Sequence, residues 1–358
     1  TLSPSSDDTP TIDVIGVSTG DTVTLYSDDE CLESVTSGAV VVAAPSVSIT
    51  LDSLGDDGNY KFYAKTVDSS QESVGCSKSY VSYSYISDIS SSESVTIGNE
   101  AYTNSDGGTS FTWDFYADST SIYISEGTYG GQGDALDGYT YFKIWDGSAW
   151  QYNKGTTFTK ATYTDGSIEY ISAISNPVAG IDSQASYMFF SGEAVARMVY
   201  SLENTTSSAI AVDLSYGGNL GSDSGTQILG SSNGDGSLST SDNWLRTDDG
   251  STTGGDPSLI HVFGDNGSSL WDTASVTGSS NDNVYVTLGD GIGASDGISI
   301  PAGETYHFLF FIQMKSSGSE TATIVNTGRY DSLTDLDNNG LLSGQAASKS
   351  FINWSGSP

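Results

Sequence analysis

Basic side chains are scarce in this sequence. Its 358 residues include 11 Lys and Arg against 45 Asp and Glu, a formal net charge of −34. A field of this sign repels nucleic-acid phosphates and anionic headgroups, so we expect no nucleic acid among the partners. No apolar run approaches the ~20 residues of a membrane-spanning helix, so direct membrane insertion is not expected either. The chain begins at Thr1 without a basic leader and is interpreted as a processed form or a fragment.

Helical periodicity is also missing. No segment repeats its apolar residues every 3.6 positions, apart from a short turn of helix expected within 341–348. Most acidic residues are Asp and stand beside Gly, Ser, Asn and Thr, which is the composition of turns. With 42 Gly and 21 Tyr, this pattern describes short strands joined by polar loops. The predicted fold class is all-β.

A change of composition along the chain predicts two β-sandwiches. Six short strands are expected before residue 86, at the spacing that an immunoglobulin-like (Ig-like) sandwich requires. Longer and more aromatic strands follow, such as "TSFTWDFYA" (109–117) and "TYHFLFFIQM" (305–314). The predicted boundaries are a linker (1–10), an Ig-like β-sandwich (11–86), a Ser-rich hinge (87–94) and a larger antiparallel β-sandwich (95–358).

The sequence has only two cysteines. Cys31 follows the second expected strand and Cys76 opens the last strand of the first domain. This region has no CxxC and no histidine, so it lacks the four ligands of a zinc site and the base of a thiol nucleophile. We therefore predict a Cys31–Cys76 disulfide, which implies an oxidising compartment.

The first domain carries a resemblance to a known family. The stretches "TPTIDVIGVSTGDTVTLYSDDEC" (9–31) and "LDSLGDDGNYKFYAKTVDSSQESVGCSKSYVSYSY" (51–85) resemble bacterial Ig-like modules that repeat in large secreted surface proteins and adhesins. The domain lacks the core Trp of antibody-type modules. The resemblance implies a spacer or adhesive module without catalytic residues. The remainder is only weakly similar to large β-sandwich domains of uncharacterised secreted bacterial proteins, through "YSLENTTSSAIAVDLSYGGNLGSDSGTQ" (200–227) and "NWLRTDDG" (243–250).

Residues for nucleophilic catalysis are few. The pattern GxSxG occurs at "GSSNG" (230–234) and "GASDG" (293–297), but both sites continue into polar loop, whereas a nucleophile elbow needs a strand before the serine and a helix after it. The histidines, His261 and His307, lie in apolar strand-like segments and are interpreted as structural. Acidic residues are too numerous for any pair to be singled out as a glycosidase dyad. The sequence is therefore predicted not to be an enzyme.

The sharpest local motif is "DLDNNG" (335–340). Asp335, Asp337 and Asn339 stand at positions 1, 3 and 5 of a calcium loop, and glycine follows at position 6. Ser343 at position 9 is a further candidate ligand, but position 12 is alanine, so another carboxylate such as Asp331 would have to complete the site. The alternative is an ordinary turn rich in Asp and Asn. The predicted cofactor, if any, is a structural Ca²⁺.

Aromatic residues raise the possibility of sugar recognition. "WDGSAW" (145–150) reads as a hairpin tip with Trp145 and Trp150 at its ends and Asp146 beside them. Indole faces stack on sugar rings, and an aspartate binds hydroxyls. The alternative is that these rings only pack against the sheet. Trp145, Trp150 and Asp146 are the candidate ligand-binding residues.

The functional prediction is an extracellular adhesion or recognition protein at the cell surface. The Ig-like module is the spacer, and the large sandwich contacts a cell-surface glycan or protein. One alternative is a structural subunit of an extracellular filament, sheath or surface layer, whose partners are copies of itself. A second alternative is a secreted carbohydrate-active enzyme.

Overall fold

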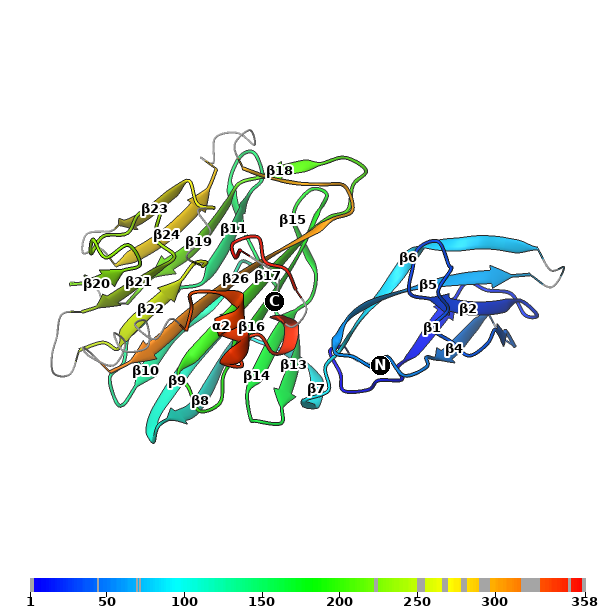
Figure 1. Cartoon of the computed structure of the whole chain (residues 1–358), viewed down its shortest axis with the longest axis horizontal. Helices are drawn as coiled ribbons and strands as arrows, with labels where there is room; N and C mark the ends of the chain where they lie inside the picture. Colours follow the sequence, from blue (N-terminus) through cyan, green and yellow to red (C-terminus); the bar gives the residue numbers. More distant parts are fainter. Residues whose placement is uncertain are drawn as a thin grey trace. The chain divides into compact units, whose positions relative to one another are not determined.

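In the computed structural model of the chain, the regular secondary structure is almost entirely β-strand, which confirms the predicted all-β fold class (Figure 1). It describes residues 3–43, 45–68, 70, 72–221, 225–249, 255–265, 270–277, 282–289, 297–316, 329–346 and 349–355. The chain divides into two compact units, which we call unit 1 (1–93 with 161–164) and unit 2 (94–160 with 165–358). None of the described helices has the length and apolar character needed to cross a membrane.

Unit 1 is a small sandwich of two antiparallel sheets. One sheet pairs β1 with β4, and the other has the order β3-β2-β5-β6. Residues alternate along β2, so that Val23 and Leu25 point inward and pack with Ile49, Phe62 and Tyr83. The strands are β1 (Thr11–Ile15), β2 (Thr22–Tyr26), β3 (Val40–Val41), β4 (Ser46–Thr50), β5 (Gly58–Val67) and β6 (Ser73–Tyr85).

The predicted disulfide is present in this unit. Cys31 in the turn after β2 is bonded to Cys76 in β6, with a Cα–Cα distance of 5.6 Å. The bond joins two segments that are 45 positions apart. The interpretation of the cysteines as a staple is confirmed.

The predicted linker is hydrogen-bonded to unit 1 over its described part. The N–H of Ser5 donates to the carbonyl of Ser84 at 3.0 Å, and the N–H of Leu54 donates to the carbonyl of Asp8 at 2.9 Å. The Tyr83 hydroxyl donates to a carbonyl of the same segment. Backbone bonding of this kind is independent of the Ser, Pro and Asp composition that suggested a free linker.

The predicted Ser-rich hinge is a strand instead. Residues 89–96 form β7 (Ile89–Thr96), which is the edge strand of the largest sheet next to β13 (Thr157–Tyr163). The Ser90 hydroxyl donates to the Thr162 carbonyl at 2.8 Å. An edge strand is held by its backbone and buries little side-chain surface, so a run of serines is compatible with it.

Unit 2 is built on a ten-stranded antiparallel sheet. Its order is β20-β21-β22-β26-β17-β16-β14-β13-β7, with β15 also paired to β16. Besides β7 and β13, the strands are β14 (Ile168–Ser172), β15 (Ser175–Val178), β16 (Ile181–Phe189), β17 (Val195–Asn204), β20 (Gln227–Ser231), β21 (Trp244–Asp248), β22 (Ser258–Val262) and β26 (Thr305–Lys315).

A second layer packs on one face of this sheet. It contains a three-stranded sheet, β10-β9-β8, and a five-stranded sheet, β12-β11-β19-β24-β23. A bridge between Ile124 and Tyr139 connects the two sheets. A separate pair joins β18 (Ile210–Val212) to β25 (Ile298–Ile300). The layer's strands are β8 (Asn99–Asp106), β9 (Thr109–Ala117), β10 (Ile122–Tyr129), β11 (Tyr141–Trp145), β12 (Trp150–Tyr152), β19 (Leu214–Asn219), β23 (Thr273–Thr277) and β24 (Asn283–Leu288).

Aromatic side chains fill the space between the two layers. The ring of Phe142 in β11 stacks on Tyr200 in β17 with centroids 4.3 Å apart. Tyr216 in β19 stacks on Phe310 in β26 at 3.8 Å. Because side chains alternate along a strand, the residues on either side of Phe142 and Tyr216 point away from this core, toward the outer face of the second layer.

The C-terminal segment covers the other face of the ten-stranded sheet. Its helix α2 (Leu333–Asn338) lies across β16 and β17 (Figure 1). Tyr330 and Trp354, before and after this helix, both pack on Phe311 of β26. The segment is therefore a third layer of unit 2.

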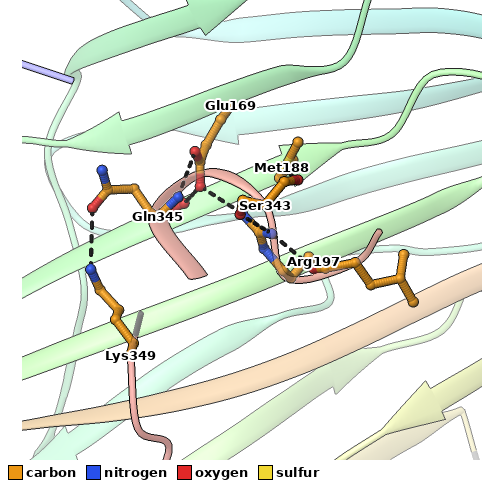
Figure 2. Close-up of polar contacts among 8 residues, drawn as sticks. Glu169, Met188, Arg197, Ser343, Gln345 and Lys349 are labelled. Atoms are coloured by element: carbon orange, nitrogen blue, oxygen red, sulfur yellow. Dashed lines mark hydrogen bonds and ion pairs between the residues drawn. The ribbon is translucent and has the colours of Figure 1, made fainter. Parts of the chain in front are cut away.

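An ion pair fastens this third layer to the sheet (Figure 2). Arg197 in β17 and Glu169 in β14 are completely buried, and Nη2 lies 2.9 Å from Oε1. The Arg197 guanidinium also donates to the carbonyl of Leu341 at 2.9 Å, and Glu169 accepts the N–H of Gln345 at 3.1 Å. Lys349, which follows on the same segment, is also buried, and burial lowers its pKa to about 8.

Candidate functional site on the outer face of the second layer

The hairpin predicted at "WDGSAW" is present. Trp145 at the end of β11 and Trp150 at the start of β12 are register partners, and their half-buried rings meet edge to face at 5.5 Å. Asp146 accepts the N–H groups of Ser148 and Ala149, each at 2.8 Å. Hydrogen bonds to Ala149 and Ser148 lower the pKa of Asp146 to about 2. Asp146 is therefore engaged in closing the turn, and ligand binding by this hairpin stays a prediction.

Tyrosines beside this hairpin form a larger surface, which we call the tyrosine platform. Its members are half-buried and come from β9, β10, β11, β12 and β24. Three contacts join neighbouring rings, with centroid distances of 5.0, 4.6 and 5.3 Å along the series from β9 to β12. The platform consists of Tyr116, Tyr123, Tyr141, Tyr152 and Tyr285.

Strand β19 provides a low floor between Tyr141 and Tyr285. Gly217 is the register partner of both tyrosines and has no side chain to fill the space between them. A Cβ at this position would lie 1.9 Å from the carbonyl oxygen of Val284, and the φ of +145° also favours glycine. The close approach of β24 therefore requires glycine at this position, and the Tyr285 ring lies beside its backbone.

Lys143 lies in the middle of the platform. Its Nζ is 4.3 Å from the ring centroid of Tyr285, 5.4 Å from that of Tyr152 and 5.9 Å from that of Tyr141. These are the separations of cation–π contacts. Burial among the rings lowers the pKa of Lys143, because desolvation disfavours the charged form.

The same burial keeps the tyrosines neutral. Desolvation raises the pKa of Tyr141 above its ordinary value, and it does the same for Tyr123 and Tyr285. Neutral phenols donate hydrogen bonds from their hydroxyls and present apolar ring faces. The platform therefore combines flat apolar surface, neutral donors and one cation.

Two carboxyl groups lie on the same face beside Tyr116. Asp114 is two positions before Tyr116 in β9, and its register partner in β10 is Glu126, next to a bulge. Directly paired side chains have Cβ atoms about 4.5–5.5 Å apart. Burial raises the pKa of Asp114. Among the described carboxyl groups with a resolved shift, Asp114 alone moves upward, which is the direction needed for a proton donor.

In "TSFTWDFYA" (109–117) the alternating rings Phe111, Trp113 and Phe115 are buried, and Tyr116 lies on the other face. In "YTYFKIW" (139–145) the alternation places Tyr141 and Lys143 on the outer face. Sequence reasoning singled out the tryptophans of the hairpin and missed the tyrosines. The pattern indicates which residues share a face, but it does not indicate that β9, β10, β11 and β24 become neighbours.

The predicted calcium residues lie in and around α2. Ser332 is the N-cap of the helix, and its hydroxyl accepts the N–H of Asp335. Asn339 ends the helix and donates to the Asp335 carbonyl at 2.6 Å. Leu333 and Leu336 are buried on one side, so "DLDNN" forms a short helix against the sheet rather than an open loop.

The remaining predicted ligands do not converge with these. Asp331 and Asp337 are exposed, and the carbonyl of Ser343 accepts a hydrogen bond from Arg197 at 2.5 Å. The described residues include no group of three or more His, Cys, Asp or Glu side chains arranged to hold a metal. The short helix expected within 341–348 is the 3-10 turn η1 (Gly344–Ala346). Calcium binding stays a prediction.

Both histidines are strand residues. His261 in β22 is completely buried beside the Thr247 hydroxyl at 2.9 Å, and burial lowers its pKa to about 3. In β26, His307 bonds the Ser201 hydroxyl through Nδ1 at 2.8 Å, and its pKa is also lowered by burial. Ser232 lies in a turn without a following helix, and Ser295 lies outside the described residues.

A small cavity occurs elsewhere in unit 2. It is lined by Leu220, Thr247, Asp248 and Leu259, among others, and is only large enough for about one water molecule. It has no room for a sugar ring. The outer face with the platform is therefore the better candidate for a ligand site.

Comparisons with known proteins were made for the sequence and for the fold. No protein-family model matches the sequence, and no curated protein matches it. The Ig-like resemblance of the first domain therefore stays a prediction.

Several solved structures resemble the chain in fold. A candidate aldose 1-epimerase from Klebsiella pneumoniae superposes with a TM-score of 0.45 at 7% identity, over 68% of this chain and 96% of its own. A galactose mutarotase-like protein from Lactobacillus casei gives 0.38 at 10%, over 61% and 100%. A candidate aldose 1-epimerase from Escherichia coli K12 gives 0.35 at 11%, also over 61% and 100%.

These neighbours correct the functional prediction. They are sugar-epimerase and mutarotase-like proteins, not adhesins or filament subunits. The predictions of an adhesion or recognition protein and of a chain without enzymatic activity are wrong on this comparison. At these scores and identities no activity is carried over from any one neighbour, so the argument below rests on the side chains of this chain.

Proposed function

We propose that this chain is a carbohydrate-active enzyme that holds an oligosaccharide along the tyrosine platform. The observation that carries the proposal is the series of half-buried rings from Tyr116 through Tyr123 and Tyr141 to Tyr152, each 4.6–5.3 Å from the next. The C–H face of a pyranose ring packs on an aromatic face, and sugar hydroxyls bond the phenol groups. A series of rings offers successive stacking positions to several sugar units.

Asp114 and Glu126 supply acid–base groups at one end of this series. A saccharide stacked on Tyr116 would bring an oxygen of its glycosidic or hemiacetal group close to Asp114. Burial favours the protonated form of Asp114, which donates a proton to that oxygen, and Glu126 is the neighbouring carboxylate that accepts one. The Cys31–Cys76 bond supports an extracellular location for this activity.

The platform is tested by truncating one of its rings. Tyr123→Ala removes the ring that contacts both Tyr116 and Tyr141, and we expect affinity for bound oligosaccharides to fall about tenfold, since an aromatic contact of this size contributes about 0.5–1.5 kcal/mol. Binding is measured by calorimetry after a screen of oligosaccharides that follows bond cleavage and anomeric composition by NMR. Tyr80→Ala, in the Tyr63–Tyr80 pair of unit 1, is the matched control. Equal affinities for both variants and the unmodified chain would contradict the proposal.

The role of Asp114 predicts a pH profile. A general acid acts in its protonated form, so activity is present at low pH and is lost as pH rises through the raised pKa of Asp114, above the ordinary value of about 3.9. Asp114→Asn should lower kcat by about 10²–10⁴-fold and remove this limb of the profile. Glu100→Gln, at an exposed carboxyl of β8, is the control and should leave the profile as it is. An unchanged limb in the Asp114 variant would exclude Asp114 as the donor.

A further inference from the structure

Lys143 has no carboxylate partner. Its neighbours are the rings of Tyr141, Tyr152 and Tyr285, and no described carboxylate lies within ion-pair distance of its Nζ. This is unexpected in a chain with 45 acidic residues and 11 basic ones. Burial lowers the pKa of Lys143.

Three other poorly exposed cations of unit 2 have a carboxylate oxygen within ion-pair distance, and their side-chain exposure is 0–12%. The pairs are Arg197–Glu169, Lys315–Asp106 and Arg329–Glu193. The buried Lys349 instead donates to the side-chain oxygen of Gln345 at 3.5 Å. Because a desolvated charge without a counter-charge is unfavourable, the unpaired Lys143 at a proposed binding surface indicates that its counter-charge arrives with the ligand.

We propose that the saccharide held by the platform is acidic, and that its carboxylate or sulfate group pairs with the ammonium of Lys143. This inference rests on the proposed function, because it assigns the substrate class of the same surface. The register partners of Lys143 and Tyr141 in β19 are the small residues Ser215 and Gly217, and the Lys143 side chain is only partly buried. The Tyr285 hydroxyl, whose pKa is raised by burial, donates to the same anionic group without repelling it.

The positions of the rings and of Lys143 indicate the length of the saccharide. The ring series from Tyr116 to Tyr152 passes Tyr141, over which Lys143 also lies. Strands in a sheet are about 4.8 Å apart, so the path from β9 through β10 to β11 is about the length of two sugar units. The ligand class is therefore an acidic oligosaccharide, with its anionic group near Lys143 and its reacting end near Asp114.

Matched pairs of probes test this inference in the full chain. One pair is tetragalacturonate and its neutral methyl ester, and the other is a sulfated cello-oligosaccharide and its unsulfated form. Affinities are measured by calorimetry at a fixed ionic strength of about 0.15 M, because the net charge of the chain repels anions at low salt. The variants are Lys143→Gln, Lys143→Met, which keeps the apolar stem against the tyrosines, and Lys143→Arg, which keeps the charge. Melting temperatures verify that each variant is folded.

We expect one acidic probe to bind about tenfold or more tightly than its neutral partner, as for a hydrogen-bonded charge pair. Lys143→Gln and Lys143→Met should abolish this preference, whereas Lys143→Arg should retain it. The pair that shows the preference tells carboxylate from sulfate. Equal affinity for acidic and neutral probes, with Tyr123→Ala weakening both, would overturn the inference and leave the proposed function in place. No binding of any probe, or binding that is insensitive to Tyr123→Ala, would overturn both.

Discussion

Replacing Arg197 with methionine is expected to lower the free energy of unfolding of unit 2 by about 3–5 kcal/mol, the usual effect of removing one partner of a buried ion pair. Glu169 would keep its hydrogen bond from the Gln345 N–H but would lose the opposing charge 2.9 Å away. The carbonyls of Leu341 and Ser343 would lose their donor at the same time. The C-terminal layer should therefore loosen from the ten-stranded sheet.

Tryptophan fluorescence during urea unfolding measures this effect selectively. All 6 tryptophans of the sequence lie after residue 93, in unit 2, so the signal reports that unit alone. Lys315→Met is the control, because its pair with Asp106 retains some solvent exposure, unlike the fully buried Arg197–Glu169 pair, and should contribute less. Combining Arg197→Met with Glu169→Met should recover part of the loss, since neither charge of the pair then remains buried without its partner. Equal losses of unfolding free energy for the Arg197 and Lys315 variants would show that the buried Arg197–Glu169 pair stabilises unit 2 no more than the Lys315–Asp106 pair does.

Removing the disulfide is expected to destabilise unit 1 by about 4 kcal/mol, because the bond closes a loop of about 45 residues whose entropy is otherwise lost on folding. The double variant Cys31→Ser with Cys76→Ser avoids a free thiol. Unit 1 is small and has a core of only a few apolar side chains around Val23 and Phe62, so an effect of this size is a large part of its stability.

Circular dichroism and fluorescence together locate the loss. The double cysteine variant should show an earlier unfolding transition by circular dichroism, while the tryptophan fluorescence transition of unit 2 stays where it is. A reductant should shift the unmodified chain in the same way and leave the variant unchanged. A shift of the fluorescence transition instead would mean that the two units do not unfold separately.

Some features were determined locally along the chain. Alternation of apolar and polar residues located strands such as 109–117 and 305–314, since side-chain direction in a strand has a period of two. The spacing and isolation of Cys31 and Cys76 were enough to indicate the disulfide. The scarcity of helical periodicity was enough for the all-β class.

The local sequence pattern predicted the wrong conformation at two places where contacts with distant segments determine the structure. The Ser-rich stretch at 87–94 became part of β7 because an edge strand needs hydrogen bonds rather than apolar side chains. "DLDNNG" matches half of a calcium loop, yet Leu333 and Leu336 pack on the sheet and turn it into α2. In both cases the local sequence is compatible with two conformations, and contacts with residues distant in the sequence determine which one forms.

The candidate site depended on tertiary structure for the same reason. The sequence by itself determined that Tyr116, Tyr141 and Lys143 each point to one face of a strand. Only the pairing of β11 with β19 and of β19 with β24 brought Lys143 over Tyr285, 142 positions away, across the bare backbone of Gly217. The two-residue repeat of a strand determines the face on which each side chain lies. The order of the strands is set by long-range packing of the core. That order brought the tyrosines together and placed Lys143 among them, with no described carboxylate within ion-pair distance.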